Sequence, residues 1–188
     1  RYSQLQCPKE PNSTLVDGIL AGDLAVQCCP SCQGVWIPPE HYKAWQATQP
    51  AVAPDAMPKA LSVDHTPSSL DSRGALCPDC RRYLSRARVN LQSPFYVERC
   101  PSCGGIWCDQ GEWEALTAMG LQTIIDRLFT AEWQAKARQL ELEAQERQAM
   151  IDKLGADLAT KVFELGKLLR EHPNGDFGVA YLMRRFEQ

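Results

Sequence analysis

The sequence predicts a small, metal-stabilised α+β fold in two modules, each a β-hairpin with cysteine-containing turns plus a short helix, followed by an all-α C-terminal region. Three observations predict it. Nine cysteines fall in closely spaced groups, the pattern around them occurs twice, and after residue 111 cysteine is absent while good helix formers dominate. We assign residues 1–46 and 75–118 to the two modules, residues 47–74 to a Pro-rich linker and residues 119–188 to the helical region.

The overall composition is that of an ordinary globular protein. The chain has 188 residues, with 20 Lys and Arg against 23 Asp and Glu, which gives a net charge of -3. This balance disfavours a surface that binds nucleic acid non-specifically, because such binding needs clustered cations. No apolar run approaches the ~18 residues of a membrane span, and the N-terminus lacks a signal-peptide core. We therefore expect a cytoplasmic protein without a membrane span.

Four cysteines of the second module have the spacing of a metal site. They form two C-P-x-C pairs, and residues 81–99 between the pairs suffice for an antiparallel hairpin. Two-residue turns direct both thiolates of a pair toward one point, which is typical of a structural four-thiolate zinc site. A disulfide framework is disfavoured by the odd number of cysteines and by a reducing cytoplasm. The sequence thus predicts Zn²⁺ on Cys77, Cys80, Cys100 and Cys103.

The first module repeats this pattern incompletely. Residues 29–36, C-P-S-C-Q-G-V-W, align with residues 100–107, C-P-S-C-G-G-I-W. Only three cysteines have clear counterparts, since Glu10 stands where the second module has a cysteine. A second zinc ion is therefore possible here, on Cys7, Cys29 and Cys32.

The fourth ligand of this first site stays open at the sequence level. Glu10 has the right sequence position, Cys28 is an extra thiol, and His41 lies at the start of the next helix. Zinc accepts cysteine, histidine or carboxylate ligands. The alternative is a site without metal, whose thiols pack as small apolar residues.

The stretch from 100 to 112, C-P-S-C-G-G-I-W-C-D-Q-G-E, resembles the bacterial "transcription factor zinc-finger" family. The ribbon of that family is similar to the one in eukaryotic transcription factor IIB. The resemblance implies two tandem zinc-ribbon, rubredoxin-like modules with the metal ligands named above. The first copy is degenerate, because Pro38 and Glu40 replace Asp109 and Gly111 of the signature.

The remaining signature residues have structural interpretations. We expect Gly34 and Gly105 to supply the left-handed residue that often follows a zinc turn. Trp36 and Trp107 would cover the metal sites, and Asp109 would cap the following helix. Unpartnered cysteines are usually small buried apolar residues, and we interpret Cys28, unless it is a ligand, and Cys108 in this way.

The linker and the tail differ in character. Residues 47–74 contain four prolines and no clear period, so we expect an extended tether in which His65 has no metal role. The two modules would then move independently or pack face to face. In the tail, apolar residues at helical spacing predict amphipathic helices. They are Ile124, Ile125, Leu128, Phe129 and Trp133; then, after a cap at Asp157, Leu158, Val162, Leu165 and Leu169; and last Tyr181, Leu182 and Phe186 in a helix over 179–186.

The sequence predicts a protein that is not an enzyme. A four-thiolate site has no open coordination position, and no nucleophile–base pair or phosphate-binding loop is present. The leading hypothesis is an adaptor or assembly factor that binds a protein partner through its ribbons and C-terminal helices, which could also self-associate.

The main alternative hypothesis is nucleic-acid binding by an arginine-rich hairpin with interleaved aromatic residues. The glycine after the cysteine turn also resembles, weakly, the zinc domain of J-domain chaperones and suggests a thiol-dependent holdase. The nucleic-acid candidates are Arg81, Arg82, Arg86, Arg88 and Arg99.

Overall fold

The computed structural model describes residues 4–60, 62–89 and 92–187. The chain divides into two compact units, residues 1–135 and 136–188, and each is described by itself. The first unit contains every strand and both cysteine-rich segments, whereas the second is helical. A mixed α+β region followed by an all-α region is therefore confirmed.

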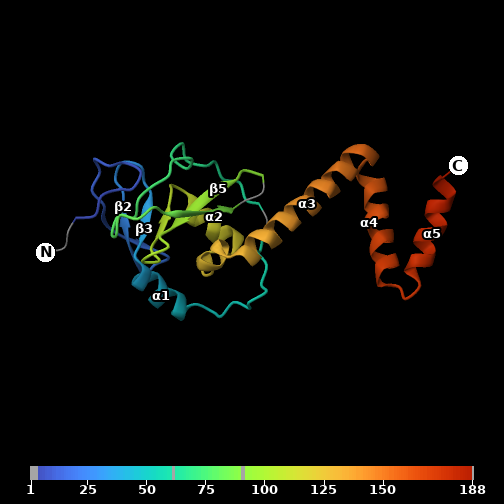
Figure 1. The fold of residues 1–188 in the computed structure, drawn as a ribbon, viewed down its shortest axis with the longest axis horizontal. Helices are drawn as coiled ribbons and strands as arrows, with labels where there is room; N and C mark the ends of the chain where they lie inside the picture. Colours follow the sequence, from blue (N-terminus) through green and yellow to red (C-terminus); the bar gives the residue numbers. More distant parts are fainter. Residues whose placement is uncertain (1–3, 61, 90–91, 188) are drawn as a thin grey trace. The chain divides into compact units, whose positions relative to one another are not determined.

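One antiparallel sheet forms the centre of the first unit (Figure 1). Its strand order is β1-β2-β3-β6-β5-β4, so three strands from the first cysteine-rich segment meet three from the second at the β3–β6 pair. The predicted alternatives, independent modules or face-to-face packing, are both wrong, because the two segments join edge to edge through strand hydrogen bonds. The strands are β1 Val16–Leu20, β2 Leu24–Cys28, β3 Val35–Ile37, β4 Ser85–Val89, β5 Phe95–Arg99 and β6 Ile106–Cys108.

Two tryptophans lie opposite each other at this central pair. Trp36 on β3 is in register with Trp107 on β6, and both are almost completely buried. The Trp107 ring lies against Gly34, where an added Cβ would be 2.2 Å from Cζ2, and the Trp36 ring lies against Gly105 at the same distance. Each glycine therefore leaves room for the tryptophan of the opposite segment.

The predicted left-handed role of these two glycines is wrong. The residues with positive φ are the ones before them, Gln33 at 60° and Gly104 at 84°. The left-handed residue of each turn is therefore the one before the glycine. Gly34 and Gly105 themselves lie directly against the tryptophan rings. Steric contact is what requires glycine there.

Two helices cover the sheet and contribute to its core. They are α1, Pro39–Thr48, and α2, Glu112–Met119. The Trp45 ring of α1 packs edge-on against Trp113 of α2, with the ring centroids 5.5 Å apart. Both rings belong to one apolar cluster with Leu24, Val26, Val97 and Ile106 of the sheet.

The apolar residues after α2 complete this core. Ile124, Ile125 and Leu128 are buried in it, and the segment forms a 3₁₀ helix, η1 Ile125–Phe129. The expected amphipathic α-helix here is therefore wrong. Gly120 in the left-handed conformation ends α2, and the chain turns back so that these side chains pack on the ribbons.

The linker over 47–74 is anchored along the first unit. Lys59 N donates to the Met119 carbonyl, and Arg127 donates to the carbonyls of Val52 and Ala53. Asp71 is buried near the end of the segment. Residues 47 and 48 are the last of α1, and no helix or strand forms among the described residues from 49 to 74, as a Pro-rich composition predicts, but the segment is not a free tether.

The second unit contains most of α3, Ala131–Leu154, with α4, Ala156–Glu171, and α5, Gly175–Phe186. The last two form a hairpin in which Leu169 packs against Gly178. Gly155, and not Asp157, precedes α4, and no side chain caps that helix, so the predicted cap is wrong. None of the described helices is both long and apolar enough to cross a membrane.

Candidate metal centres

The second cysteine cluster consists of Cys77, Cys80, Cys100 and Cys103. Their four sulfurs all lie within 4.8 Å of one another. Cys77 Sγ is 3.7 Å from Cys103 Sγ, and Cys80 Sγ is 3.3 Å from Cys100 Sγ. Tetrahedral zinc with Zn–S bonds of about 2.3 Å needs sulfurs about 3.8 Å apart. The four thiols therefore fit a closed zinc site.

Backbone amides around the second cluster favour thiolates. The Cys80 amide donates to Cys77 Sγ at 3.4 Å, and the Gly105 amide donates to Cys103 Sγ at 3.5 Å. Hydrogen bonds to a charged sulfur stabilise the form that binds metal. Such a site would stabilise the fold by joining the turn before β4 to the turn after β5.

The first cluster contains three thiols, Cys7, Cys29 and Cys32, also within 4.8 Å of one another. Cys7 Sγ and Cys32 Sγ are 3.6 Å apart, and the hydrogen bond from Cys32 lowers the pKa of Cys7. The Glu10 and Cys32 amides donate to Cys7 Sγ and Cys29 Sγ at 3.2 and 3.4 Å. The turn geometry of the second cluster is thus present here too.

None of the three predicted fourth ligands belongs to the first cluster in the structure. Cys28 Sγ points at Gly18 on the neighbouring strand, where an added Cβ would be 2.5 Å from it. His41 Nδ1 lies 3.0 Å from the Ala25 carbonyl oxygen. At Glu10 it is the backbone amide that contacts a cysteine.

Cys108 is completely buried among apolar side chains, as predicted, and burial raises its pKa well above the usual value. Cys28 is only half-buried, at the edge of the same core, and burial also raises its pKa. A neutral thiol is the stable form at both positions. Neither cysteine is placed to act as a metal ligand.

The two cysteine clusters share one small core. It contains the buried cysteines of both, with Leu15 and Leu84 and the two tryptophans. Because each tryptophan lies on the glycine of the opposite cysteine turn, each covers the other segment's turn. We therefore expect disruption of one cluster to loosen the other.

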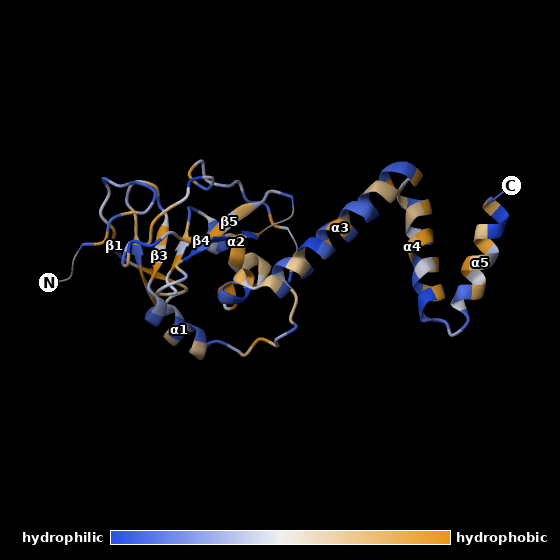
Figure 2. Ribbon diagram, viewed as in Figure 1, coloured by the Kyte–Doolittle hydropathy of each residue, from blue (hydrophilic) through white to orange (hydrophobic). Residues whose placement is uncertain are grey.

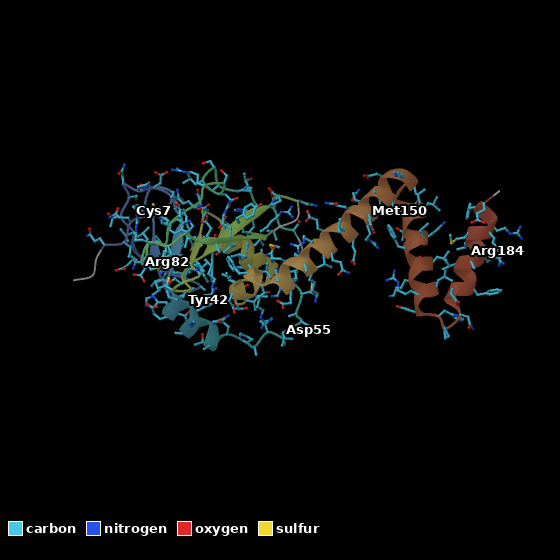
Figure 3. All side chains as sticks on the ribbon, viewed as in Figure 1. Cys7, Tyr42, Asp55, Arg82, Met150 and Arg184 are labelled. Carbon is cyan, nitrogen blue, oxygen red and sulfur yellow. The ribbon has the colours of Figure 1, made fainter. Side chains whose placement is uncertain are left out.

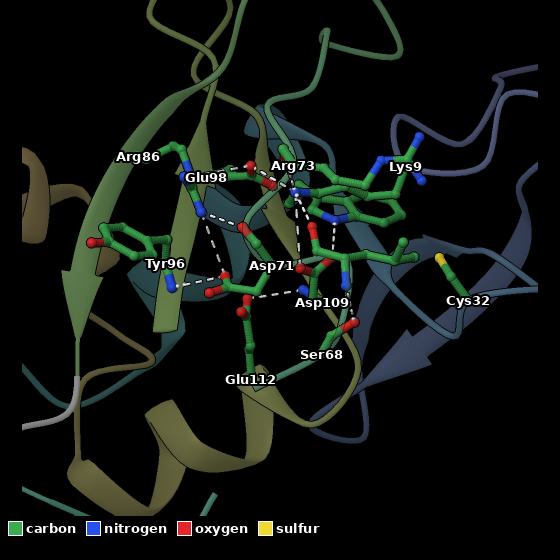
Figure 4. Close-up of polar contacts among 12 residues, drawn as sticks. Lys9, Cys32, Ser68, Asp71, Arg73, Arg86, Tyr96, Glu98, Asp109 and Glu112 are labelled. Atoms are coloured by element: carbon green, nitrogen blue, oxygen red, sulfur yellow. Dashed lines mark hydrogen bonds and ion pairs between the residues drawn. The ribbon is translucent and has the colours of Figure 1, made fainter. Parts of the chain in front are cut away.

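A buried lysine links the first cysteine turn to the second segment (Figure 4). The Lys9 side chain is completely buried, and its Nζ lies 2.8 Å from Glu98 Oε1 on β5. Lys9 Nζ also donates to the carbonyls of Arg73 and Leu70, at 2.5 and 3.2 Å. Burial raises the pKa of Glu98 to about 7, and Lys9 opposes the shift. The three N–H groups of the ammonium therefore have three acceptors within the protein.

A buried acidic cluster adjoins this lysine. Carboxylate oxygens of Asp71, Asp109 and Glu112 lie within 4.8 Å of one another. Each has a structural partner, since Asp71 accepts from the Tyr96 amide, Asp109 from Trp107 Nε1, and Glu112 from the Asp109 amide. Burial raises the pKa of Asp109 and, more strongly, of Glu112. Asp109 therefore orients the indole, and its predicted role as a helix cap is wrong.

The five candidate arginines differ in their exposure and in their partners. Arg81 and Arg82 are exposed beside Tyr83, which is 79% exposed, and Figure 3 labels Arg82. Arg86 is exposed too, but its guanidinium has partners: it lies 3.6 Å from Glu98 and stacks on the Tyr96 ring, 4.2 Å from its centroid. It also donates to the Asp71 carbonyl. Arg88 and Arg99 are half-buried.

The sheet, the cysteine turns and the four-sulfur cluster define a zinc-ribbon domain. Residues 76–119 match the family described as "Transcription factor zinc-finger", which supports the resemblance seen in the sequence. The match and the two cysteine clusters identify Zn²⁺ as the metal. No curated protein and no solved structure shows significant similarity to the chain.

Lys9 and Glu98 were missed by the sequence reasoning. Lys9 lies inside the C-P-x-x turn of the first segment, and its side chain is completely buried. The only available signal was charge, because the turn carries Lys9 where its counterpart carries Asp79. The ion pair depends on β3 joining β6, and a single sequence does not reveal that pairing.

Proposed function

We propose that the chain is a non-enzymatic adaptor or assembly factor of the cytoplasm, with two zinc-ribbon modules as a rigid core and the α4–α5 hairpin as its protein-binding element. The observation that carries the proposal is the apolar surface of that hairpin. The cytoplasmic location agrees with nine cysteines, none of which forms a disulfide bond.

The α4–α5 hairpin exposes more apolar surface than its own packing uses. Phe177 is 73% and Leu168 is 65% exposed. Figure 2 shows hydrophobic residues interleaved with hydrophilic ones along both helices, whereas α3 is mainly hydrophilic. Exposed apolar residues on amphipathic helices are typical of helix-in-groove binding. The exposed apolar residues of this surface are Leu158, Val162, Leu165, Leu168, Phe177, Val179, Tyr181, Met183 and Phe186.

Both ends of the hairpin have charges that would orient a partner. The first turns of α4 and α5 carry Asp157 and Asp176, and the last turns carry Arg170 and the pair Arg184 and Arg185. These charges complement the helix dipoles and flank the apolar surface. A partner with an apolar groove and charged rims would match this arrangement, as would a second copy of the hairpin.

The second candidate function is nucleic-acid binding, favoured by exposed Arg81, Arg82 and Tyr83 at one cysteine turn. Phosphate contact and base stacking need this combination of side chains. Fewer than five arginines are available to contact phosphate, because Arg86 already forms ion pairs with Glu98 and Asp71. We therefore prefer the adaptor function.

A pull-down of the tagged full chain with and without nuclease separates the two functions. We expect a discrete set of proteins that survives nuclease, and direct binding of one of them to the purified chain. Leu165→Glu on the apolar face should abolish that binding, whereas Thr160→Glu on an exposed polar position of α4 should preserve it.

The charge-reversal variant Arg81→Glu/Arg82→Glu is the complementary test. If the adaptor function is correct, this variant keeps the protein partner. Recovery of RNA or DNA that depends on these two arginines, with all proteins lost after nuclease, would replace the adaptor function by the nucleic-acid one. Unchanged zinc content controls for folding of the ribbon unit, and unchanged helical circular dichroism controls for folding of the α4–α5 hairpin.

A further inference from the structure

The first cysteine cluster has an oxygen where the second has its fourth sulfur. In the second cluster the sulfurs pair as Cys77 with Cys103 and Cys80 with Cys100, at 3.7 and 3.3 Å. In the first, the corresponding Cys7–Cys32 pair is 3.6 Å apart. The counterpart of Cys100 is Cys29, and its Sγ lies 3.2 Å from Ser13 Oγ. Ser13 thus stands in the place of Cys80.

Backbone hydrogen bonds explain how Ser13 reaches this position. The Cys7 amide donates to the Ser13 carbonyl at 2.8 Å. In the second segment, the Cys77 amide donates in the same way to the Arg82 carbonyl at 2.7 Å. Farther along, Leu15 pairs with Leu5 as Leu84 pairs with Ala75. The turn between Cys7 and Leu15 is one residue longer than its counterpart. The extra residue lets the far side of the turn place a side chain at the cluster.

The Ser13 hydroxyl is held in place from two sides. The residue is 7% exposed, and Ser31 Oγ donates to Ser13 Oγ at 3.1 Å. This donor fixes the oxygen with a lone pair available on its other side. This small, buried oxygen thus lies beside Cys29 as Cys80 Sγ lies beside Cys100, and zinc needs a fourth ligand at that corner of its tetrahedron.

We infer that the first site binds Zn²⁺ through the thiolates of Cys7, Cys29 and Cys32 and the oxygen of Ser13. The inference does not depend on the proposed function. A serine oxygen is a weaker zinc donor than a thiolate, so this zinc exchanges faster than the one in the four-thiolate site. The chain thus holds one permanent and one exchangeable zinc ion.

Cadmium-113 NMR of the full chain, with Cd²⁺ replacing Zn²⁺, tests this ligand set. The resonance of each site moves downfield as sulfur replaces oxygen or nitrogen. We expect two separate resonances, one in the four-sulfur range and one upfield of it in the range for three sulfurs and an oxygen. Ser13→Cys should move the upfield resonance into the four-sulfur range, and Ser13→Ala should shift it without affecting the other.

Matched variants keep the test specific. Glu10→Gln, Cys28→Ser and His41→Gln each remove one of the other candidate ligands and should leave both resonances unchanged. A wild-type spectrum with two four-sulfur resonances, or with one cadmium per chain, would overturn the inference. An upfield resonance that Ser13→Ala leaves in place would also overturn it, because the oxygen would then come from solvent. Circular dichroism confirms that each variant is folded.

Discussion

The two cysteine-rich segments have the same strand order and the same turn geometry, yet they differ at one corner of the metal site. The second segment has four thiols, and the first has three thiols with the hydroxyl of Ser13 beside one of them, Cys29. Both keep the tryptophan and the glycine that join them across the β3–β6 pair. The first segment thus keeps the residues that contact the second segment, although it lacks the fourth cysteine ligand.

This difference indicates that the two metal sites of the one sheet have different roles. The second site is closed and contributes stability, because four thiolates hold a zinc ion without an open position. The first site is tied into the same core by Trp36, Trp107 and the buried Lys9. A weaker metal site is tolerated there because the neighbouring segment supports its turn.

Loss of a metal ligand should give the largest effect and should separate the two sites. Cys100→Ser removes a thiolate from the closed site, where bound zinc contributes on the order of 10 kcal/mol to folding. We expect it to abolish the cooperative thermal transition seen by circular dichroism. Cys29→Ser should lower the midpoint and leave a transition. An equal effect of the two changes would contradict the difference between the sites.

Removal of the buried ammonium should break the link between the segments. Lys9→Met removes the buried ammonium that lies 2.8 Å from Glu98 and leaves only the more distant Arg86, at 3.6 Å, as its cationic partner; we expect a cost of about 3 kcal/mol. The double variant Lys9→Met/Glu98→Gln should recover much of this loss, because no unpaired charge remains. Urea unfolding measures both. No recovery in the double variant would contradict the role of the ion pair and would show that the ammonium acts through its hydrogen bonds to the Leu70 and Arg73 carbonyls.

The two glycine positions test the symmetry of the central contact. Gly34→Ala and Gly105→Ala each place a methyl group against a buried indole, which should cost about 3 kcal/mol. Since the two contacts are equivalent, the variants should lose similar amounts of unfolding free energy. Gly166→Ala, at a helical glycine with open space around it, is the matched control. A large loss at only one of the two sites would refute the reciprocal arrangement.

The smallest expected effect is a change in the pH dependence of stability in the Glu112→Gln variant. It concerns the second segment alone, because the first segment has His41 at the corresponding position. Burial raises the pKa of Glu112, so the folded state binds a proton that the unfolded state releases above its ordinary pKa of about 4.5. Stability from this proton is complete at low pH and is lost as pH rises toward the folded pKa. The difference in unfolding free energy, variant minus wild type, should therefore increase with pH. A constant or falling difference would contradict the burial of a neutral carboxyl group.

The sequence predicted the four-sulfur cluster well because its ligands are local in two short turns. Cys77 and Cys80, like Cys100 and Cys103, need only a tight turn and one hairpin to meet. The role of Gly34 and Gly105 could not be predicted in this way, because it depends on how β3 and β6 join. Ser13 could not be predicted as a ligand from the alignment of the two segments. The first turn is one residue longer than the second, and the alignment places Glu10, not Ser13, opposite Cys80.

Native mass spectrometry of the full chain, before and after brief exposure to a chelator, tests the central difference most directly. The account predicts two zinc ions per chain at first, one after the chelator, and two again in the chelator-treated Ser13→Cys variant. A single zinc before treatment, or loss of both ions together, would contradict it.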